Sequence, residues 1–236
     1  MPRIVPAIVF LSVLALGVAL MFFADARVAT YLNEHGIAAA LRQKGSSLRI
    51  LSEVLKQPGE WYIALTAAVI VTLFPPKPWR APLPLETPPA AGGRYPTWTA
   101  AWPATLFVVL SALAASANVL FKWIAGRQRP LRGGQFFGDA LTFSPFRGGL
   151  PGFFDQTNLS LPSGHATSAF ALAAALCILY PRLSPLFVLA ATATATERVL
   201  TNSHYPSEVL LAALLGTTTT LLIAKLFKPK STDRPS

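Results

Sequence analysis

The chain contains little charge and almost no cysteine. Only 13% of its 236 residues are Asp, Glu, Lys or Arg, about half the share that is usual in soluble domains. Cys177 is the only cysteine, which excludes an intrachain disulfide and leaves the redox compartment open. Hydrophobic residues make up 53% of the chain, and the mean hydropathy is +0.48. This composition predicts a protein that resides in a membrane.

Acidic residues and histidines are also scarce. Ten Asp and Glu against twenty Lys and Arg give a formal net charge of +10, and only three histidines occur. The sequence contains no compact cluster of His, Asp and Glu, so we predict no metal and no other cofactor. The basic residues are scattered over loops and chain ends, which argues against nucleic acid as a partner. They favour anionic lipid, because each Lys or Arg near acidic headgroups contributes about 1 kcal/mol of attraction.

Six apolar runs are candidate membrane spans. A spanning helix needs about 20 predominantly apolar residues, and the second and fifth runs are shorter or rich in threonine. In chain order the runs are Ile4–Phe23, Trp61–Phe74, Trp98–Ala125, Ser163–Tyr180, Pro185–Thr196 with an extension toward Arg198, and Val209–Phe227. We therefore predict a single transmembrane domain, residues 1–236, that folds as an all-α integral membrane six-helix bundle.

The first apolar run has a competing interpretation. Ala24-Asp25-Ala26 follows the run and resembles a signal-peptidase site, and the basic Arg3 precedes it. The apolar core of a secretory signal has about 7–15 residues, whereas this run has 20. We therefore expect a retained helix.

The segments between the runs differ in composition. Residues 27–60 carry apolar residues at helical spacing among basic ones, which predicts an interfacial amphipathic segment. Residues 75–97 form a Pro-rich loop, and prolines from Pro75 to Pro103 argue against helix over most of that stretch. Residues 228–236 form a basic tail. The Phe-rich segment 131–161 either packs its loop onto the helices or forms a lipid-facing lid.

Three short polar motifs interrupt the apolar runs. The first, residues 122–130, contains Lys122 and Arg129. Seven residues are two helical turns, so we expect both cations on nearly one face at the end of the third helix, which Pro130 then ends. Either side chain alone could simply extend to the membrane interface. Together they can bind a phosphate dianion through charged hydrogen bonds.

The second motif, residues 162–165, reads Pro-Ser-Gly-His and precedes an Ala-rich apolar run. Ser163 is predicted as the N-cap of that helix, whose free backbone N–H groups form an anion site. Gly164 has no side chain, so an oxyanion can approach its backbone. His165 follows directly. Taken alone, the tetrapeptide is also a common start for an ordinary helix.

The third motif, residues 198–208, contains Arg198, His204 and Glu208. A carboxylate four residues after a histidine, at the start of a helix, can reach the imidazole, fix its tautomer and increase its basicity. An ordinary turn that begins the last helix would explain His204 and its neighbours equally well when this motif is taken alone.

The three motifs, KxxxxxxRP, PSGH and RxxxxxHxxxE, resemble the signature of the type 2 phosphatidic acid phosphatase superfamily of membrane lipid phosphatases. The resemblance covers Lys122–Glu208, with the motifs in the right order and apolar helices between them. It implies metal-independent hydrolysis of a phosphate monoester or diphosphate on a membrane lipid. It also implies that His204 attacks phosphorus to form a phosphohistidine, while His165 protonates the leaving oxygen and later activates water. Glu208 would support His204, and the phosphate oxygens would be held by Lys122, Arg129, Ser163, Gly164 and Arg198.

The chain departs from the usual family pattern at two positions. Glu208 stands where the family usually has Asp, and Glu197 stands before the arginine where Ser is usual. A small backbone adjustment can absorb the extra methylene of Glu208. Glu197 adds negative charge beside an anion site, and this would weaken substrate binding unless a neighbouring cation pairs with it.

The motifs must open on one face of the membrane to form one site. Helices four and five are expected to form a hairpin, which returns the third motif to the face of the first two. The opposite face, with the N-terminus and the tail, has slightly more Lys and Arg once Lys122, Arg129 and Arg198 are set aside. The positive-inside rule then makes that face cytoplasmic. We therefore expect a bacterial-type cytoplasmic (inner) membrane protein with its active site at the outer, periplasmic membrane–water interface.

Several functions share this signature. Members act on phosphatidate, phosphatidylglycerol phosphate, undecaprenyl diphosphate or lipid A phosphates, and the Phe-rich loop is most similar to the lipid A and undecaprenyl diphosphate branches. A lipid phosphotransferase using the same intermediate is one alternative, and a catalytically impaired lipid-binding or transport member is another. Vanadium haloperoxidases have a related site, but they are soluble. We predict no obligate protein partner.

Overall fold

The computed structural model describes residues 4–76, 97–147, 149–155 and 157–227, most of which are helical. The first half contains α1 (Ile4–Phe23), α2 (Asp25–Glu34), α3 (Ile37–Arg42), α4 (Ser47–Lys56), the 3-10 turn η1 (Gln57–Gly59), α5 (Trp61–Leu73), α6 (Thr97–Ser116) and α7 (Asn118–Ala125). The second half contains β1 (Leu131–Arg132), β2 (Gln135–Phe136), α8 (Gly149–Phe154), α9 (Gly164–Leu179), η3 (Pro181–Leu183), α10 (Ser184–Leu200), α11 (Pro206–Ala224) and η4 (Lys225–Phe227).

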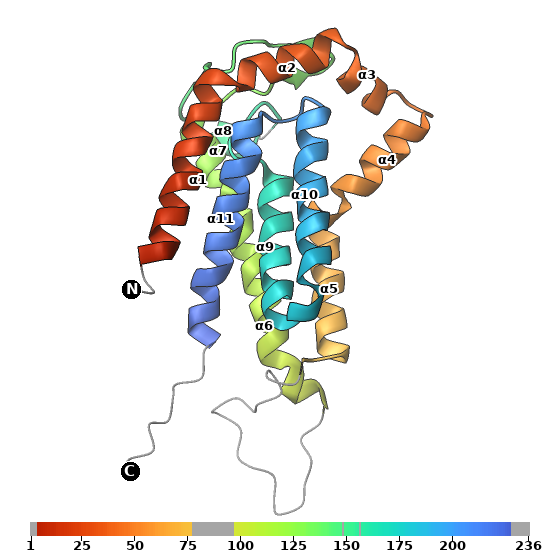
Figure 1. Cartoon of the computed structure of the whole chain (residues 1–236), viewed down its shortest axis with the longest axis vertical. Helices are drawn as coiled ribbons and strands as arrows, with labels where there is room; N and C mark the ends of the chain where they lie inside the picture. Colours follow the sequence, from red (N-terminus) through yellow and green to blue (C-terminus); the bar gives the residue numbers. More distant parts are fainter. Residues whose placement is uncertain (1–3, 77–96, 148, 156, 228–236) are drawn as a thin grey trace, which may run out of the picture.

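The long apolar helices pack side by side in one bundle (Figure 1). Helix α9 lies at its centre and contacts α6, α10 and α11, while α5 packs against α6 and α1 packs against α11. Small residues allow close approach, since a Cβ on Gly216 of α11 would lie 2.3 Å from the carbonyl oxygen of Thr167 on α9. Such contacts are typical of membrane bundles, where lipid supplies no hydrophobic force between helices.

All six predicted apolar runs are helical, but fewer qualify as membrane spans. Among the described residues, Pro103–Ala125 and Pro206–Phe227 are long and apolar enough to cross a membrane. A third span results if Ala7–Phe23 and Asp25–Glu34, bent by 54°, count as one. Helices α5 and α9 are apolar but have only 13 and 16 residues. The protein is therefore a mostly helical membrane protein, and six crossings stay a prediction.

The prediction that the third helix continues to Pro130 is wrong. Helix α7 ends at Ala125 because Gly126 adopts the left-handed conformation, with φ of 61°. A Cβ at this position would lie 1.8 Å from the carbonyl oxygen of Ser144, so only glycine fits. Lys122 therefore lies in the last helical turn, and Arg129 lies in the loop beyond it.

Helix α6 begins at Thr97 and contains Pro103, so the last residues of the Pro-rich stretch are helical, as the predicted run Trp98–Ala125 implies. Most of the Pro-rich loop and the basic tail lie outside the described residues. The all-α prediction also omits a small hairpin in which Leu131 pairs with Phe136.

The predicted interfacial segment forms helices α2, α3 and α4. In Figure 1, α2 and α3 lie across the end of the bundle where α10 ends and α11 begins, and α4 runs down beside α10. Helix α4 packs against α10, and the Thr194 hydroxyl donates to the carbonyl oxygen of Leu55 at 2.8 Å. Ile50 and Val54 of α4 are exposed. An amphipathic helix with an uncovered apolar face suits a position among lipid headgroups.

The Phe-rich segment is packed onto α7. Phe146 and Phe153 lie edge-on against Trp123, with ring centroids 4.9 and 5.7 Å from the indole. The indole Nε1–H also donates to the carbonyl oxygen of Gly149 at 3.0 Å. These contacts favour the packing interpretation over a detached lid, although the side chain of Phe154 is 82% exposed and can contact lipid.

Candidate functional site

His204 lies in the loop between α10 and α11 and is only 2% exposed. Its Nδ1–H donates to Oε2 of Glu208, in the first turn of α11, at 3.0 Å. The Ser160 hydroxyl donates to the same carboxylate oxygen and lies 3.3 Å from Nδ1. The predicted contact between His204 and Glu208 is confirmed. Because Nδ1 carries the donated proton, Nε2 keeps its lone pair.

The surroundings of His204 keep the imidazole neutral. Burial lowers the pKa of His204 well below its usual range, and the positive charges of Arg129, Lys122 and Arg198 lower it further. Those charges come from the first and third motifs, so the two motifs converge on one histidine. A neutral imidazole that is oriented by a carboxylate can act as a nucleophile at neutral pH.

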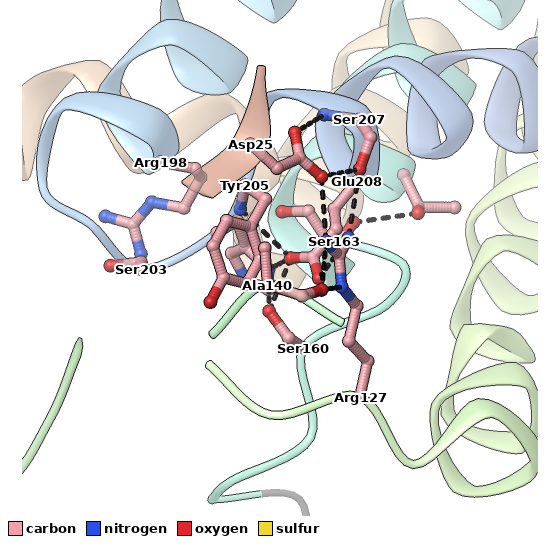
Figure 2. Close-up of polar contacts among 12 residues, drawn as sticks. Asp25, Arg127, Ala140, Ser160, Ser163, Arg198, Ser203, Tyr205, Ser207 and Glu208 are labelled. Carbon is pink, nitrogen blue, oxygen red and sulfur yellow. Dashed lines mark hydrogen bonds and ion pairs between the residues drawn. The ribbon is translucent and has the colours of Figure 1, made fainter. Parts of the chain in front are cut away.

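Arg127, which the sequence argument overlooked, fixes the position of Glu208. Its side chain is fully buried, with Nη1 3.2 Å from Oε1 of Glu208 and Nη2 2.8 Å from Oδ2 of Asp25. The guanidinium also donates to the Ser207 hydroxyl and to the carbonyl oxygen of Ala140, both at 2.9 Å. Figure 2 shows these groups meeting at the start of α11. Burial of Arg127 between two carboxylates holds Glu208 beside His204.

Asp25 connects the N-terminal helices to this network. Its Oδ1 accepts the backbone N–H of Ser207 at 2.9 Å, and its Oδ2 accepts the Ser207 hydroxyl (Figure 2). Both partners of the pair with Arg127 are fully buried, and loss of one partner from such a pair costs about 3–5 kcal/mol. The sequence signal for this pairing was the position of Asp25 after a long apolar run, because an acidic residue at the end of a membrane helix needs a partner.

Lys122 and Arg129 are two cations of the first motif, one buried and the other partly buried. Lys122 is 7% exposed, and its Nζ lies 3.5 Å from the position that a Cβ would take on Gly164. The ammonium group thus lies against the N-terminus of α9. Within the described part of the chain, no ion pair involves Lys122, and Nε of Arg129 is buried without a hydrogen-bond partner.

Ser163 is the N-cap of α9, as predicted, but its hydroxyl does not cap the helix. The side chain is fully buried, and no acceptor or donor among the described residues reaches its Oγ. A buried hydroxyl without a partner costs about 1–3 kcal/mol. An oxyanion bound at this helix N-terminus would satisfy both the hydroxyl and the free backbone N–H groups.

Glu197 does not place an uncompensated charge in the site. Nε of Arg198 donates to its carboxylate, and the Ser52 hydroxyl of α4 donates to it at 2.6 Å. Arg198 is therefore the neighbouring cation that offsets this departure from the family pattern. The pairing ties α4 to the last turn of α10.

A pocket of about 490 Å³ opens beside Arg129 and Arg198. Six of the residues that line it are basic and two are acidic, namely Arg42, Arg49, Lys56, Arg129, Arg132, Arg198, Glu53 and Glu197. Arg42 of α3 was not anticipated; it donates to the carbonyl oxygen of Thr201 at 2.8 Å and to the Ser203 hydroxyl at 3.0 Å. The excess positive charge suits an anionic ligand.

His165 lies in the first turn of α9, and its side chain is 34% exposed. Its Nε2 is 3.2 Å from Oε1 of Glu60, the residue that precedes α5. Nothing in the local sequence pattern marks Glu60 as a partner of this histidine. Gly164, the residue before His165, lies against the ammonium group of Lys122, so the second motif adjoins the first.

The comparison with known families is consistent with this geometry. Residues 103–231, slightly more than half of the chain, match the PAP2 superfamily. The chain belongs to the PAP2 superfamily. All three motifs lie within the matched residues, so the superfamily predicted from them is confirmed.

Two curated relatives are named lipid A 1-phosphatase. The one from Rhizobium johnstonii is 36% identical over 137 residues, which are 56% of this chain and 50% of the relative. The one from Rhizobium etli is 35% identical over 135 residues, which are 56% of this chain and 52% of the relative. The chain thus spans about half the length of the curated relatives it matches.

Two solved structures share the fold over nearly the whole chain. Aquifex aeolicus LpxE has a TM-score of 0.52 at 16% identity, covering 86% of this chain and 96% of its own. The first transmembrane PAP2 type phosphatidylglycerolphosphate phosphatase from Bacillus subtilis has a TM-score of 0.53 at 17% identity, covering 97% and 98%. At these identities the likeness shows the fold alone, a PAP2 membrane bundle.

Proposed function

We propose that this PAP2 protein is a lipid phosphate phosphatase. It hydrolyses a phosphate monoester or diphosphate on a membrane lipid through a phosphohistidine, without a metal ion. One observation carries the proposal: a neutral histidine that Glu208 orients lies in the positive field of Lys122, Arg129 and Arg198. Among the described residues, Nε of Arg129 and the Ser163 hydroxyl are also buried without a hydrogen-bond partner. Positive charge and an activated nucleophile are the two requirements of phosphoryl transfer by this route.

The reaction has two balanced steps. First, Nε2 of His204 attacks phosphorus, and the bond to the lipid oxygen breaks as His165 gives that oxygen a proton. Glu208 offsets the positive charge that develops on the His204 ring. Water then loses a proton to His165 and attacks phosphorus, the phosphorus–nitrogen bond breaks, and inorganic phosphate leaves. Growing charge on the equatorial oxygens is stabilised by Lys122, Arg129, Arg198, the Ser163 hydroxyl and the backbone at Gly164.

The 1-phosphate of lipid A is the first substrate to test. Both curated relatives are named for that activity. The strongly basic pocket beside Arg129 and Arg198 also favours a headgroup with more than one anionic group. Undecaprenyl diphosphate shares this property, whereas phosphatidate has a single phosphate.

Phosphate release by purified protein in detergent tests the function. We expect release from lipid A or undecaprenyl diphosphate, with phosphatidate and phosphatidylglycerol phosphate completing the panel. Activity should persist in excess EDTA, because the positive charge comes from Lys122, Arg129 and Arg198. Vanadate should inhibit, since it mimics five-coordinate phosphorus. Loss of activity in EDTA that Mg²⁺ restores, or no release from any lipid, would contradict the proposal.

We place the site on the periplasmic face of a bacterial cytoplasmic membrane. Lys44 and Gln135 are exposed residues of segments beside the site, and Arg182 is exposed in the turn between α9 and α10. In a Cys177→Ser background, Lys44→Cys and Gln135→Cys should react with an impermeant maleimide in spheroplasts. Arg182→Cys should react only after permeabilisation. The reverse pattern would contradict the orientation, and labelling of Lys44→Cys and Gln135→Cys from opposite faces would contradict a shared site.

A further inference from the structure

The carboxylate of Glu60 contacts His165, the second histidine of the site. Oε1 of Glu60 lies 3.2 Å from Nε2 of His165, and the two side chains are 23% and 34% exposed. We propose that Glu60 is a positioning residue for the proton transfers of His165. It holds the imidazole through Nε2–H, so that Nδ1 is the nitrogen that exchanges a proton with the reacting oxygen. This inference rests on the proposed function and adds a residue to it.

The backbone before Glu60 is shaped to touch His165. The turn η1 packs against α9 and α10. A Cβ on Gly59 would lie 2.5 Å from the carbonyl oxygen of His165 and 2.8 Å from its Cα. These are backbone atoms that cannot move aside, so only glycine permits this approach. The position of Glu60 relative to His165 is therefore set by main-chain packing as well as by the reach of its side chain.

Glu60 favours the protonated form of His165 against the other groups around it. Burial disfavours the protonated imidazole of His165, and the neighbouring cations Arg198 and Lys56 add to this effect. Glu60 is the neighbouring anion that acts in the opposite sense. Without Glu60, His165 would be a poorer proton donor to the leaving oxygen, because fewer molecules would hold the proton when the substrate binds.

Each histidine is thus held by a carboxylate, but the two rings have different roles: His204 attacks phosphorus, and His165 transfers protons. Glu208 holds the Nδ1–H of His204, which leaves a lone pair on Nε2 for attack on phosphorus. Glu60 holds His165 through Nε2 and favours its cation. In the first step the N–H bond at Nδ1 of His165 breaks, its electron pair stays on nitrogen, and the proton goes to the departing lipid oxygen. In the second step the same nitrogen takes a proton from water.

Leaving-group dependence tests this assignment. An alkoxide such as that from dodecyl phosphate leaves only if it is protonated, whereas the nitrophenolate of 4-dodecyl-2-nitrophenyl phosphate leaves without a proton. The kcat/KM value reports steps up to departure of the leaving group. Glu60→Gln should lower kcat/KM for dodecyl phosphate by about 10–100-fold and for the aryl phosphate by less than about threefold. Glu60→Asp should recover part of the loss.

A matched control and a double variant make the test specific. Glu34 is an exposed glutamate at the end of α2 that does not line the pocket, and Glu34→Gln should leave both substrates unaffected. In a His165→Ala background, adding Glu60→Gln should change kcat/KM for dodecyl phosphate by less than about twofold, because the two residues act as one unit.

Three results would overturn the inference. Equal losses for both substrates would show that Glu60 serves only the fold, and a full additional loss on top of His165→Ala would show that it acts without His165. Wild-type rates in Glu60→Gln would remove Glu60 from the reaction while leaving the proposed function intact. If the wild-type protein hydrolyses neither these phosphates nor any lipid of the panel, the proposed function fails first, and this inference fails with it.

Discussion

Replacement of His204 by alanine is expected to abolish phosphate release from the lipid substrate. No other described histidine combines burial, a neutral ring and a carboxylate at Nδ1 in this way. Loss of a nucleophile that acts with its partners as one unit typically lowers kcat by about 10⁴–10⁶-fold. Steady-state phosphate release in detergent, measured beside the wild-type protein, would show the loss.

The third histidine provides a matched control for that variant. His35 is exposed at the C-terminal end of α2, where Nδ1 contacts the carbonyl oxygen of Tyr31 and the ring stacks on the Tyr31 ring. His35→Ala removes the same side chain from a position outside the site, so its turnover should equal that of the wild type. If His204→Ala turned over as fast as the wild type, His204 could not be the nucleophile.

Replacement of Glu208 by glutamine should lower kcat by roughly 10²–10⁴-fold with little change in KM. The carboxylate accepts from His204, Ser160 and the backbone N–H of Tyr205. Among the described residues, the Glu208 carboxylate makes no hydrogen bond or ion pair with Lys122, Arg129 or Arg198. A neutral amide cannot offset the charge that develops on His204 as it attacks phosphorus, whereas binding of the ground-state phosphate does not depend on that charge.

Controls for Glu208→Gln must separate chemistry from folding. Glu208 is fully buried against Arg127, so the thermal unfolding of the variant should be compared with that of the wild type in the same detergent. Arg127 keeps its second carboxylate, Asp25, which should preserve the fold. Glu208→Asp keeps the negative charge, but its shorter side chain places the carboxylate farther from Nδ1 of His204. Its kcat should therefore lie between that of the wild type and that of Glu208→Gln. If Glu208→Gln turned over as fast as the wild type, the carboxylate would have no orienting role.

Much of the site was predictable because its chemistry is encoded over short stretches of chain. His204 and Glu208 are four residues apart at the start of a helix, a spacing that brings the two side chains together. Ser163 and Gly164 directly precede an apolar helix, so their place at its N-terminus followed from local sequence. The apolar runs predicted the helices well for the same reason, because a continuous hydrophobic run can be recognised within a single segment of the chain.

The remaining contacts depend on how distant segments pack. Asp25 and Arg127 are 102 positions apart, Glu60 and His165 are 105 apart, and Ser52 and Glu197 are 145 apart. No periodicity within one segment can pair such residues. Their common feature is chemical, because each buried charge in or near an apolar bundle needs a partner. The sequence therefore indicates that Asp25 and Glu197 require partners, and only the fold identifies them.

The end of α7 was mispredicted because two chain-breaking residues compete within five positions. Pro130 can end a helix, but Gly126 ends this one earlier by adopting a left-handed conformation against the Ser144 backbone. The consequence reaches the site. Lys122 lies in the last helical turn, whereas Arg129 lies in a loop, so the two cations do not share one helical face.

The central claim, a covalent phosphohistidine at His204, can be tested by trapping it. The protein would be mixed with a ³²P-labelled lipid phosphate, quenched with alkali within the first turnover, and digested for mass spectrometry. We expect a labelled peptide with phosphate on His204 that is stable to alkali and labile to acid, and no label in His204→Ala. Label on a serine or a carboxylate, or single-turnover phosphate release without any labelled protein, would contradict the account.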